Sequence, residues 1–140
     1  MKQYVQQKPT TPSYKAFLVG ATGATGVQLL NELLMSALCS DVVILVRRTI
    51  DVTELPNAGK LKQIVVNDSN KFFDHDHLTS LLQPEIQDFD VAFSCFGTSK
   101  KKAGGAENWV KIDPDMNKFF GRLAFRLANI HYYSIVSSIG

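Results

Sequence analysis

The sequence predicts an α/β domain built on a doubly wound parallel sheet of about five strands in the order 3-2-1-4-5. Two observations predict this class. Short apolar, β-branched runs alternate with segments of helical periodicity, and a glycine-rich turn joins the first run to the first helix. Strands that alternate with helices form βαβ units. The right-handed crossover rule then winds the sheet to both sides of its first strand, as in a Rossmann-type fold.

The expected elements follow one another without repeats or low-complexity segments. The predicted strands are Ala16–Val19, Val42–Val46, Leu61–Val66, Phe89–Phe96 and Tyr132–Val136. The predicted helices are Thr25–Leu38, Phe72–Leu82 and Asp115–Asn129. We expect the second helix to end before Pro84, because proline lacks an N–H group and clashes with the preceding turn.

Length and composition fit one globular domain. The chain has 140 residues, of which 45% are hydrophobic and 20% charged, and its formal net charge is +2. These values are ordinary for a soluble domain. So small a charge gives no reason to expect nucleic acid or an anionic membrane as a partner. No apolar run approaches the roughly 18 residues of a membrane span.

The two cysteines, Cys39 and Cys95, both lie in apolar surroundings. We expect buried free thiols in an intracellular protein, since a structural disulfide needs an oxidising compartment. The polar N-terminus has no signal-peptide core. The sequence therefore predicts a cytoplasmic location, with a nuclear or organelle-associated pool left open.

The strongest motif is the turn Gly20-Ala21-Thr22-Gly23-Ala24-Thr25-Gly26. It leaves a buried strand and enters a helix, which is the context that dinucleotide binding requires. Gly20 permits the sharp turn, Gly23 allows close approach of a pyrophosphate, and Gly26 allows the helix to pack on the strand. The helix N-terminus then offers N–H groups and a positive dipole end to the phosphates. The alternative is a tight strand–helix turn made of small residues.

The end of the second strand indicates which nucleotide is bound. NAD-binding folds usually carry an acid there for the ribose 2′-hydroxyl, whereas this chain has Arg47 and Arg48. Guanidinium groups suit a 2′-phosphate. The pair therefore predicts NADP(H), and the alternative is two solvated surface arginines. We expect residues 1–14 to form a flexible arm and residues 15–140 to form the NAD(P)-binding domain, incomplete at its C-terminus.

Two further segments are candidates for ligand contact. Cys95, Phe96, Gly97 and Thr98 follow the fourth strand, at the edge that borders the ligand crevice in doubly wound sheets. Lys100, Lys101 and Lys102 come next, and solvated lysines are the simpler interpretation. His75 and His77 resemble metal ligands, but neighbours on one short turn cannot all face a single ion. We interpret that segment as a helix start with acidic first-turn residues, and we expect no metal site.

The chain resembles the atypical short-chain dehydrogenases, and more specifically the HTATIP2-like (Tat-interacting protein TIP30) group. The resemblance covers residues 16–140. Its segments are the glycine turn, Leu45-Val46-Arg47-Arg48, Cys95-Phe96-Gly97-Thr98, Lys102-Ala103-Gly104-Gly105-Ala106-Glu107, Val110-Lys111-Ile112-Asp113-Pro114-Asp115 and Val136-Ser137-Ser138-Ile139-Gly140. The resemblance implies an NADP(H)-binding protein of oxidoreductase type.

The resemblance also implies roles for single residues. Asp68 and Ser69 would touch the adenine side, and a catalytic serine would fall on Ser137 or Ser138. Asp113 and Asn117 match family positions near the helix before the fifth strand. Superfamily chemistry uses a Tyr-x-x-x-Lys pair after that strand, but the one such pair here, Tyr4 and Lys8, precedes the first strand.

Three functions remain open from the sequence. They are an NADP(H)-dependent reductase acting on a small carbonyl substrate, a module that binds the nucleotide as a switch, and a scaffold for protein partners or for self-association. Whether the chain is catalytic is left open, because the superfamily's proton donor is not in its usual place.

Overall fold

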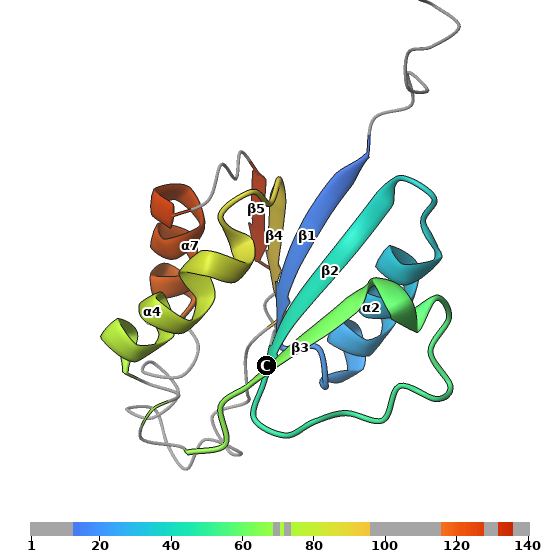
Figure 1. The fold of residues 1–140 in the computed structure, drawn as a ribbon, viewed down its shortest axis with the longest axis horizontal. Coiled ribbons are helices and arrows are strands. Elements are labelled where there is room, and N and C mark those ends of the chain that lie inside the picture. Colours follow the sequence, from blue (N-terminus) through green and yellow to red (C-terminus); the bar gives the residue numbers. More distant parts are fainter. Residues whose placement is uncertain (1–12, 69–70, 72–73, 96–115, 128–131, 136–140) are drawn as a thin grey trace, which may run out of the picture.

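The computed structural model describes residues 13–68, 71, 74–95, 116–127 and 132–135. Its strands are β1 (Tyr14–Val19), β2 (Cys39–Val46), β3 (Leu61–Val65), β4 (Val91–Ser94) and β5 (Tyr132–Ile135). They form one sheet in the order β3-β2-β1-β4-β5, and every neighbouring pair is parallel. The predicted fold class and strand order are therefore confirmed (Figure 1).

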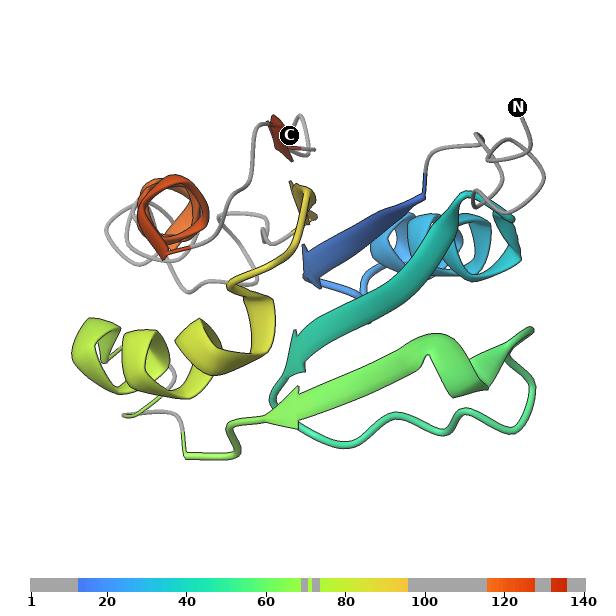
Figure 2. The same cartoon turned by 45° about the horizontal axis from the view of Figure 1, so that its top comes forward.

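Helices cover both faces of the sheet (Figure 2). The helix α2 (Ala24–Met35) lies on one face, and α4 (His75–Ile86) and α7 (Met116–Leu127) lie on the other. A short 3-10 turn, η1 (Ala58–Lys60), precedes β3. The result is a three-layer arrangement with a hydrophobic core on each side of the sheet.

The central strand β1 is apolar and buried from Ala16 to Val19. Ala16 and Leu18 pack under α2, while Phe17 and Val19 face α4 and α7. Each of these four side chains is at most 1% exposed. A strand buried on both faces reads as a continuous apolar run, which is typical of parallel sheets.

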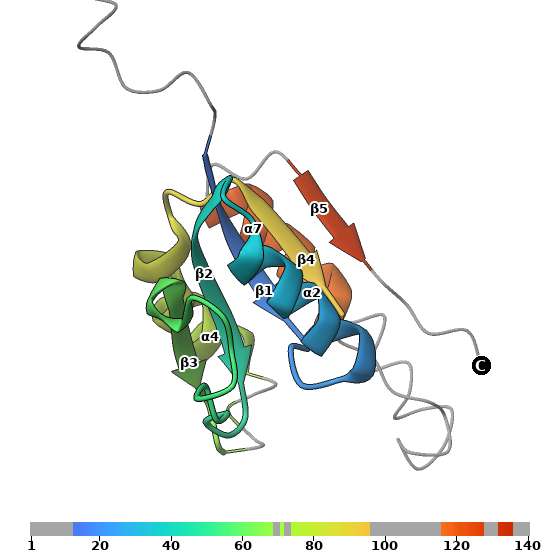
Figure 3. The same ribbon diagram turned by 90° about the vertical axis from the view of Figure 1, so that its right-hand side faces the viewer.

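The carboxyl ends of the strands meet at one edge of the sheet. There the backbone N–H of Cys95 donates to the carbonyl of Val19 at 2.9 Å, and that of Val66 donates to Val46 at 2.9 Å. β1 lies between β2 and β4, so the chain reverses its winding beside the end of β1. Figure 3 shows β5 as the outermost strand, beyond β4. Ligands of doubly wound folds bind at such a switch point.

Several predicted boundaries need correction. α4 does not end before Pro84: it continues to Ile86 with the proline inside it. Ile86 is fully buried in the core, which stabilises the last turn against the missing proline N–H group. α2 ends at Met35 rather than Leu38, because Ser36 adopts an extended conformation. β4 begins at Val91 rather than Phe89, since the Phe89 N–H closes a turn on Ile86.

The histidine segment begins α4, as predicted. The Asp74 carboxylate accepts a hydrogen bond from the backbone N–H of His77 at 3.1 Å, and the His75 ring stacks on Phe119 with centroids 4.1 Å apart. No group of three or more possible metal ligands occurs within the described ranges. His77 therefore takes part in the cap of α4 through its backbone, and the His75 ring packs against α7.

The cysteines are both free thiols. Cys39 is buried, as expected, whereas Cys95 is only partly buried at the end of β4. Burial is the main reason that the pKa of each thiol is raised above its ordinary value. Neither thiol is activated as a nucleophile by these surroundings.

Replacing Gly26 by alanine should strongly destabilise the fold. A Cβ atom there would lie 1.8 Å from the carbonyl oxygen of Gly20, and backbone cannot yield as a flexible side chain does. We expect a loss of about 3 kcal/mol or more in the free energy of unfolding, measured by urea denaturation. The matched control is Gly59→Ala, whose Cβ meets nothing within 4 Å. Equal stability of the two variants would contradict this role of Gly26.

Candidate functional site

The glycine turn joins β1 to α2 with a backbone that only some residues can adopt. Gly20 has a φ of 80°, in the left-handed region that favours glycine. The N–H of Gly23 donates to the Gly20 carbonyl at 3.4 Å, and Gly23 is the N-cap of α2 without a side-chain cap. The first turn of α2 thus keeps N–H groups that no side chain at the cap position satisfies. A helix N-terminus of this kind suits an anion.

Two glycines of the turn differ in what surrounds them. Gly26 is buried against the Gly20 carbonyl, so packing leaves no room for any side chain larger than the hydrogen of glycine. Gly23 is exposed, and a Cβ there would meet only the Gly20 oxygen, at an ordinary 3.8 Å. Packing alone therefore does not demand glycine at position 23. Thr22, Ala24 and Thr25, the other predicted contacts, are also exposed along this turn.

A hollow of about 470 Å³ opens where the glycine turn meets the end of β2. That volume is within the range of about 300–1,000 Å³ typical of small-molecule sites. Its lining consists of Gly20, Ala21, Thr22, Leu45, Val46, Arg47, Arg48, Thr49, Ile50 and Asn67. The glycine turn and the arginine pair, predicted from separate motifs, therefore share one hollow.

Six lining residues of the hollow are not among the predicted site residues: Ala21, Leu45, Val46, Thr49, Ile50 and Asn67. Thr49 and Ile50 extend the arginine segment, and Asn67 follows β3. The sequence feature that points to Asn67 as a lining residue is its neighbour Asp68, which is exposed at the same strand end. Cys95 lies beside the glycine turn, because its N–H bonds the last residue of β1, Val19.

Several predicted site residues lie outside the described residues. They are Ser69, Phe96, Gly97, Thr98, Ser137 and Ser138, together with Lys100, Lys101, Lys102 and Asp113 and the Tyr4–Lys8 pair. These assignments stay predictions.

A buried polar cluster joins β4, α7 and β5. The Ser94 hydroxyl hydrogen-bonds the side-chain oxygen of Asn117, and both residues are buried. The Tyr133 hydroxyl donates to the Asn117 carbonyl at 3.0 Å. Burial raises the pKa of Tyr133 to about 12, against a smaller lowering by a hydrogen bond with Ser94. A phenol with so high a pKa is a poor general acid near neutral pH.

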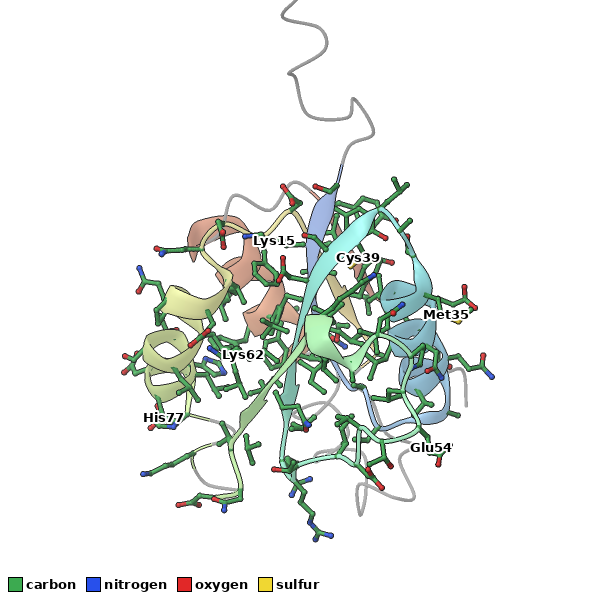
Figure 4. The ribbon with its side chains drawn as sticks, turned by 45° about the vertical axis from the view of Figure 1, so that its right-hand side comes forward. Lys15, Met35, Cys39, Glu54, Lys62 and His77 are labelled. Carbon is green, nitrogen blue, oxygen red and sulfur yellow. The ribbon has the colours of Figure 1, made fainter. Side chains whose placement is uncertain are left out.

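The opposite edge of the sheet carries balanced charge. Lys15 pairs with Asp88 and Lys62 with Glu85, each at 2.6 Å. Figure 4 shows Lys15 at the end of the sheet where β1 begins. These four residues line a smaller hollow of about 220 Å³. Exposed pairs of this kind contribute little energy, and their cancelled charges give an anion no preference for this edge.

Curated relatives from fungi and from rat match most of the chain. A mitochondrial protein named FMP52-1 from Scheffersomyces stipitis is 32% identical over 125 residues, which is 89% of this chain and 50% of that protein. The rat protein HTATIP2 is 32% identical over 124 residues, 89% of this chain and 47% of its own. The chain belongs to the group of HTATIP2 and FMP52 proteins. It spans about half the length of the curated relatives it matches.

Solved structures agree on the fold of this chain. A short chain dehydrogenase family protein from Francisella tularensis superposes with a TM-score of 0.60 over 90% of this chain and 50% of its own. Its sequence is 14% identical, so the likeness shows the fold alone. No protein-family model matches the chain.

The predicted cytoplasmic location is wrong. The FMP52 relatives from three fungi are named as mitochondrial proteins. The prediction had relied on two free thiols and a polar N-terminus, and neither feature distinguishes one intracellular compartment from another. Within the described ranges, no helix is long and apolar enough to cross a membrane.

Tyr133 should make the fold sensitive to alkali. Below pH 10 its hydroxyl is protonated in both folded and unfolded chains; between pH 10 and about 12 only the unfolded chain loses the proton. Stability is therefore lost as the pH rises through that window. We expect wild type to lose about 1–2 kcal/mol more than Tyr133→Phe between pH 9.5 and 12, a figure reduced for partial exposure. Parallel curves from urea unfolding would contradict it.

Proposed function

We propose that this chain binds NADP(H) as the nucleotide-binding portion of a short-chain-type oxidoreductase. The observation that carries the proposal is the shared hollow, where the glycine turn and two arginines line one space at the carboxyl end of the sheet. Folds of this kind place dinucleotides at that position. The family assignment supports the same function.

The glycine turn fits a pyrophosphate on chemical grounds. Gly20 supplies the left-handed turn, Gly23 leaves its surroundings open, and α2 begins without a side-chain cap. Negatively charged oxygens would accept hydrogen bonds from the first N–H groups of α2 and gain from its dipole. The role assigned to Thr22, Ala24 and Thr25 is to line this path.

The arginine pair fits the phosphate that distinguishes NADP(H) from NAD(H). Arg47 and Arg48 are exposed and line the same hollow as Gly20. In our proposal they bind the 2′-phosphate through charge-assisted hydrogen bonds. Asn67, Asp68 and Ser69 would then border the adenine.

The bound cofactor would supply or accept a hydride, and this chain's residues would hold it in place. Cys95, Phe96, Gly97 and Thr98 would lie toward the nicotinamide side, with Ser137 or Ser138 beside the carbonyl of a substrate. Reduction by the whole protein is a further part of the proposal. Tyr133 does not suit the proton-donor role because its hydroxyl donates to Asn117. The names of the FMP52 relatives support a mitochondrial location for the chain.

Gly23→Ala should weaken nucleotide binding without unfolding the protein. The added methyl group fits the fold but would stand in the path of the pyrophosphate. We expect NADPH affinity to fall about tenfold or more, measured by calorimetry, while the midpoint of unfolding changes little. A folded variant with wild-type affinity would sink the pyrophosphate assignment.

Arg47→Ala/Arg48→Ala should remove the preference for NADPH over NADH. Each charge-assisted contact is worth about 1.5–3 kcal/mol, so wild type should bind NADPH at least about tenfold more tightly. Added salt should weaken NADPH binding more than NADH binding. The double variant should bind the two cofactors alike. Equal affinities of the wild-type chain for both would refute the NADP(H) assignment.

A further inference from the structure

The segment that carries the two arginines is held at one end by Val66, which follows β3, and at the other by Gln63 in β3. At one end the Val46 carbonyl accepts a hydrogen bond from the N–H of Val66 at 2.9 Å, which extends the β2–β3 ladder. At the other end the chain turns back and reaches the side chain of Gln63. Residues 47–49 therefore lie between two backbone attachments, one to Val66 and one to Gln63.

Gln63 makes a two-point contact with the backbone of Ile50. Its Oε1 accepts from the Ile50 N–H at 2.8 Å, and its Nε2 donates to the Ile50 carbonyl at 3.2 Å. Both bonds are partly buried, and thus less exposed to competition from water. The carboxamide pairs with both the N–H and the C=O of one residue, as a neighbouring strand would. The two hydrogen bonds together fix both the distance of the Ile50 backbone from Gln63 and its orientation.

Ile50 belongs to the lining of the hollow, together with Arg47 and Arg48. The contact with Gln63 thus connects the proposed phosphate-binding wall to the sheet. The guanidinium groups stand at the ends of long side chains. The space that they can reach therefore depends on the position of the backbone at Arg47 and Arg48. Charge-assisted recognition of a phosphate needs that geometry to be set in advance.

The far half of the same β2–β3 connection is attached elsewhere. The Asp51 carboxylate accepts from the N–H and the hydroxyl of Thr53 at 2.9 and 2.8 Å. The Asn57 side chain donates to the Leu34 carbonyl at 2.9 Å, at the end of α2. Lys60 donates to that carbonyl as well, at 3.0 Å. Loss of the Asn57 contact therefore removes one anchor of the connection while the Leu34 carbonyl keeps a partner.

We propose that Gln63 is a positioning residue for nucleotide selectivity: its two hydrogen bonds to Ile50 hold Arg47 and Arg48 where they meet the 2′-phosphate. This inference rests on the proposed NADP(H) function. Gln63 does not line the hollow itself, so its effect is exerted through the backbone of the arginine segment.

The test uses Gln63→Met, which keeps the side-chain length and removes both hydrogen bonds. Gln63→Thr is the second variant, because its side chain suits a strand but is too short to reach Ile50. The matched control is Asn57→Gly, which removes an anchor of the same connection and keeps the left-handed φ of 49° accessible. The dissociation constants of NADPH and NADH are measured for each variant, with amide hydrogen exchange at Ile50.

We expect Ile50 exchange to accelerate in both Gln63 variants, because its N–H loses its acceptor. NADPH affinity should fall about five- to tenfold and NADH affinity less than twofold. Asn57→Gly should leave the ratio of the two affinities unchanged.

The possible outcomes distinguish a failure of the positioning role of Gln63 from a failure of the proposed NADP(H) function. A selective wild type whose ratio is unchanged in either folded Gln63 variant overturns the positioning role alone. An equal fall of the ratio in Asn57→Gly also overturns it, since the effect would then be general to the connection. A wild type that binds NADPH and NADH equally overturns the proposed NADP(H) preference, and the role of Gln63 in selectivity falls with it.

Discussion

The contact between the Gly20 carbonyl and the backbone of Gly26 determines how close α2 comes to β1. Any side chain at position 26 would lie within 1.8 Å of that oxygen. Because the contact is backbone on backbone, it can be relieved only by moving the helix away from the strand. The packing of the α2 residues Leu30 and Leu34 against the sheet depends on this close approach. The direction of the helix N-terminus depends on it as well. One steric requirement therefore serves the core and the candidate site together.

The candidate site depends equally on the β2–β3 connection, which is long and lacks regular structure except for η1 (Figure 1). Side chains from β3 and from the connection itself satisfy its backbone and the end of α2. Gln63 holds Ile50, while Asn57 and Lys60 bond the last carbonyl groups of α2. No basic residue occurs in the last turn of that helix, so Lys60 supplies the charge that its C-terminal dipole favours. The C-terminal end of α2 thereby meets a group of suitable charge.

Membership of the HTATIP2-like group agrees with the separate roles of the two sides of β1. The chain corresponds to about half of the length of its curated relatives, and its described residues line the hollow that we propose as the nucleotide site. On the other side of β1, Ser94, Asn117 and Tyr133 join β4, α7 and β5 through one buried and one partly buried hydrogen bond. A fully bonded buried cluster fixes the relative positions of its elements. It does not provide a group with a pKa suited to proton transfer at neutral pH.

The sequence by itself determined the fold class, the strand order and the two motifs of the site. Hydrophobic periodicity is local, and the glycine spacing encodes a turn whose geometry few residues can satisfy. Helix ends were less predictable: Pro84 argued for an earlier end of α4, but the burial of Ile86, which depends on the other elements, prevailed. Only the tertiary structure decided that the glycine turn, Arg47 and Asn67 share one hollow, and that Gln63 holds the backbone of Ile50. Such contacts join residues distant in sequence, and their geometry is set when the strands pair, so no local pattern records them.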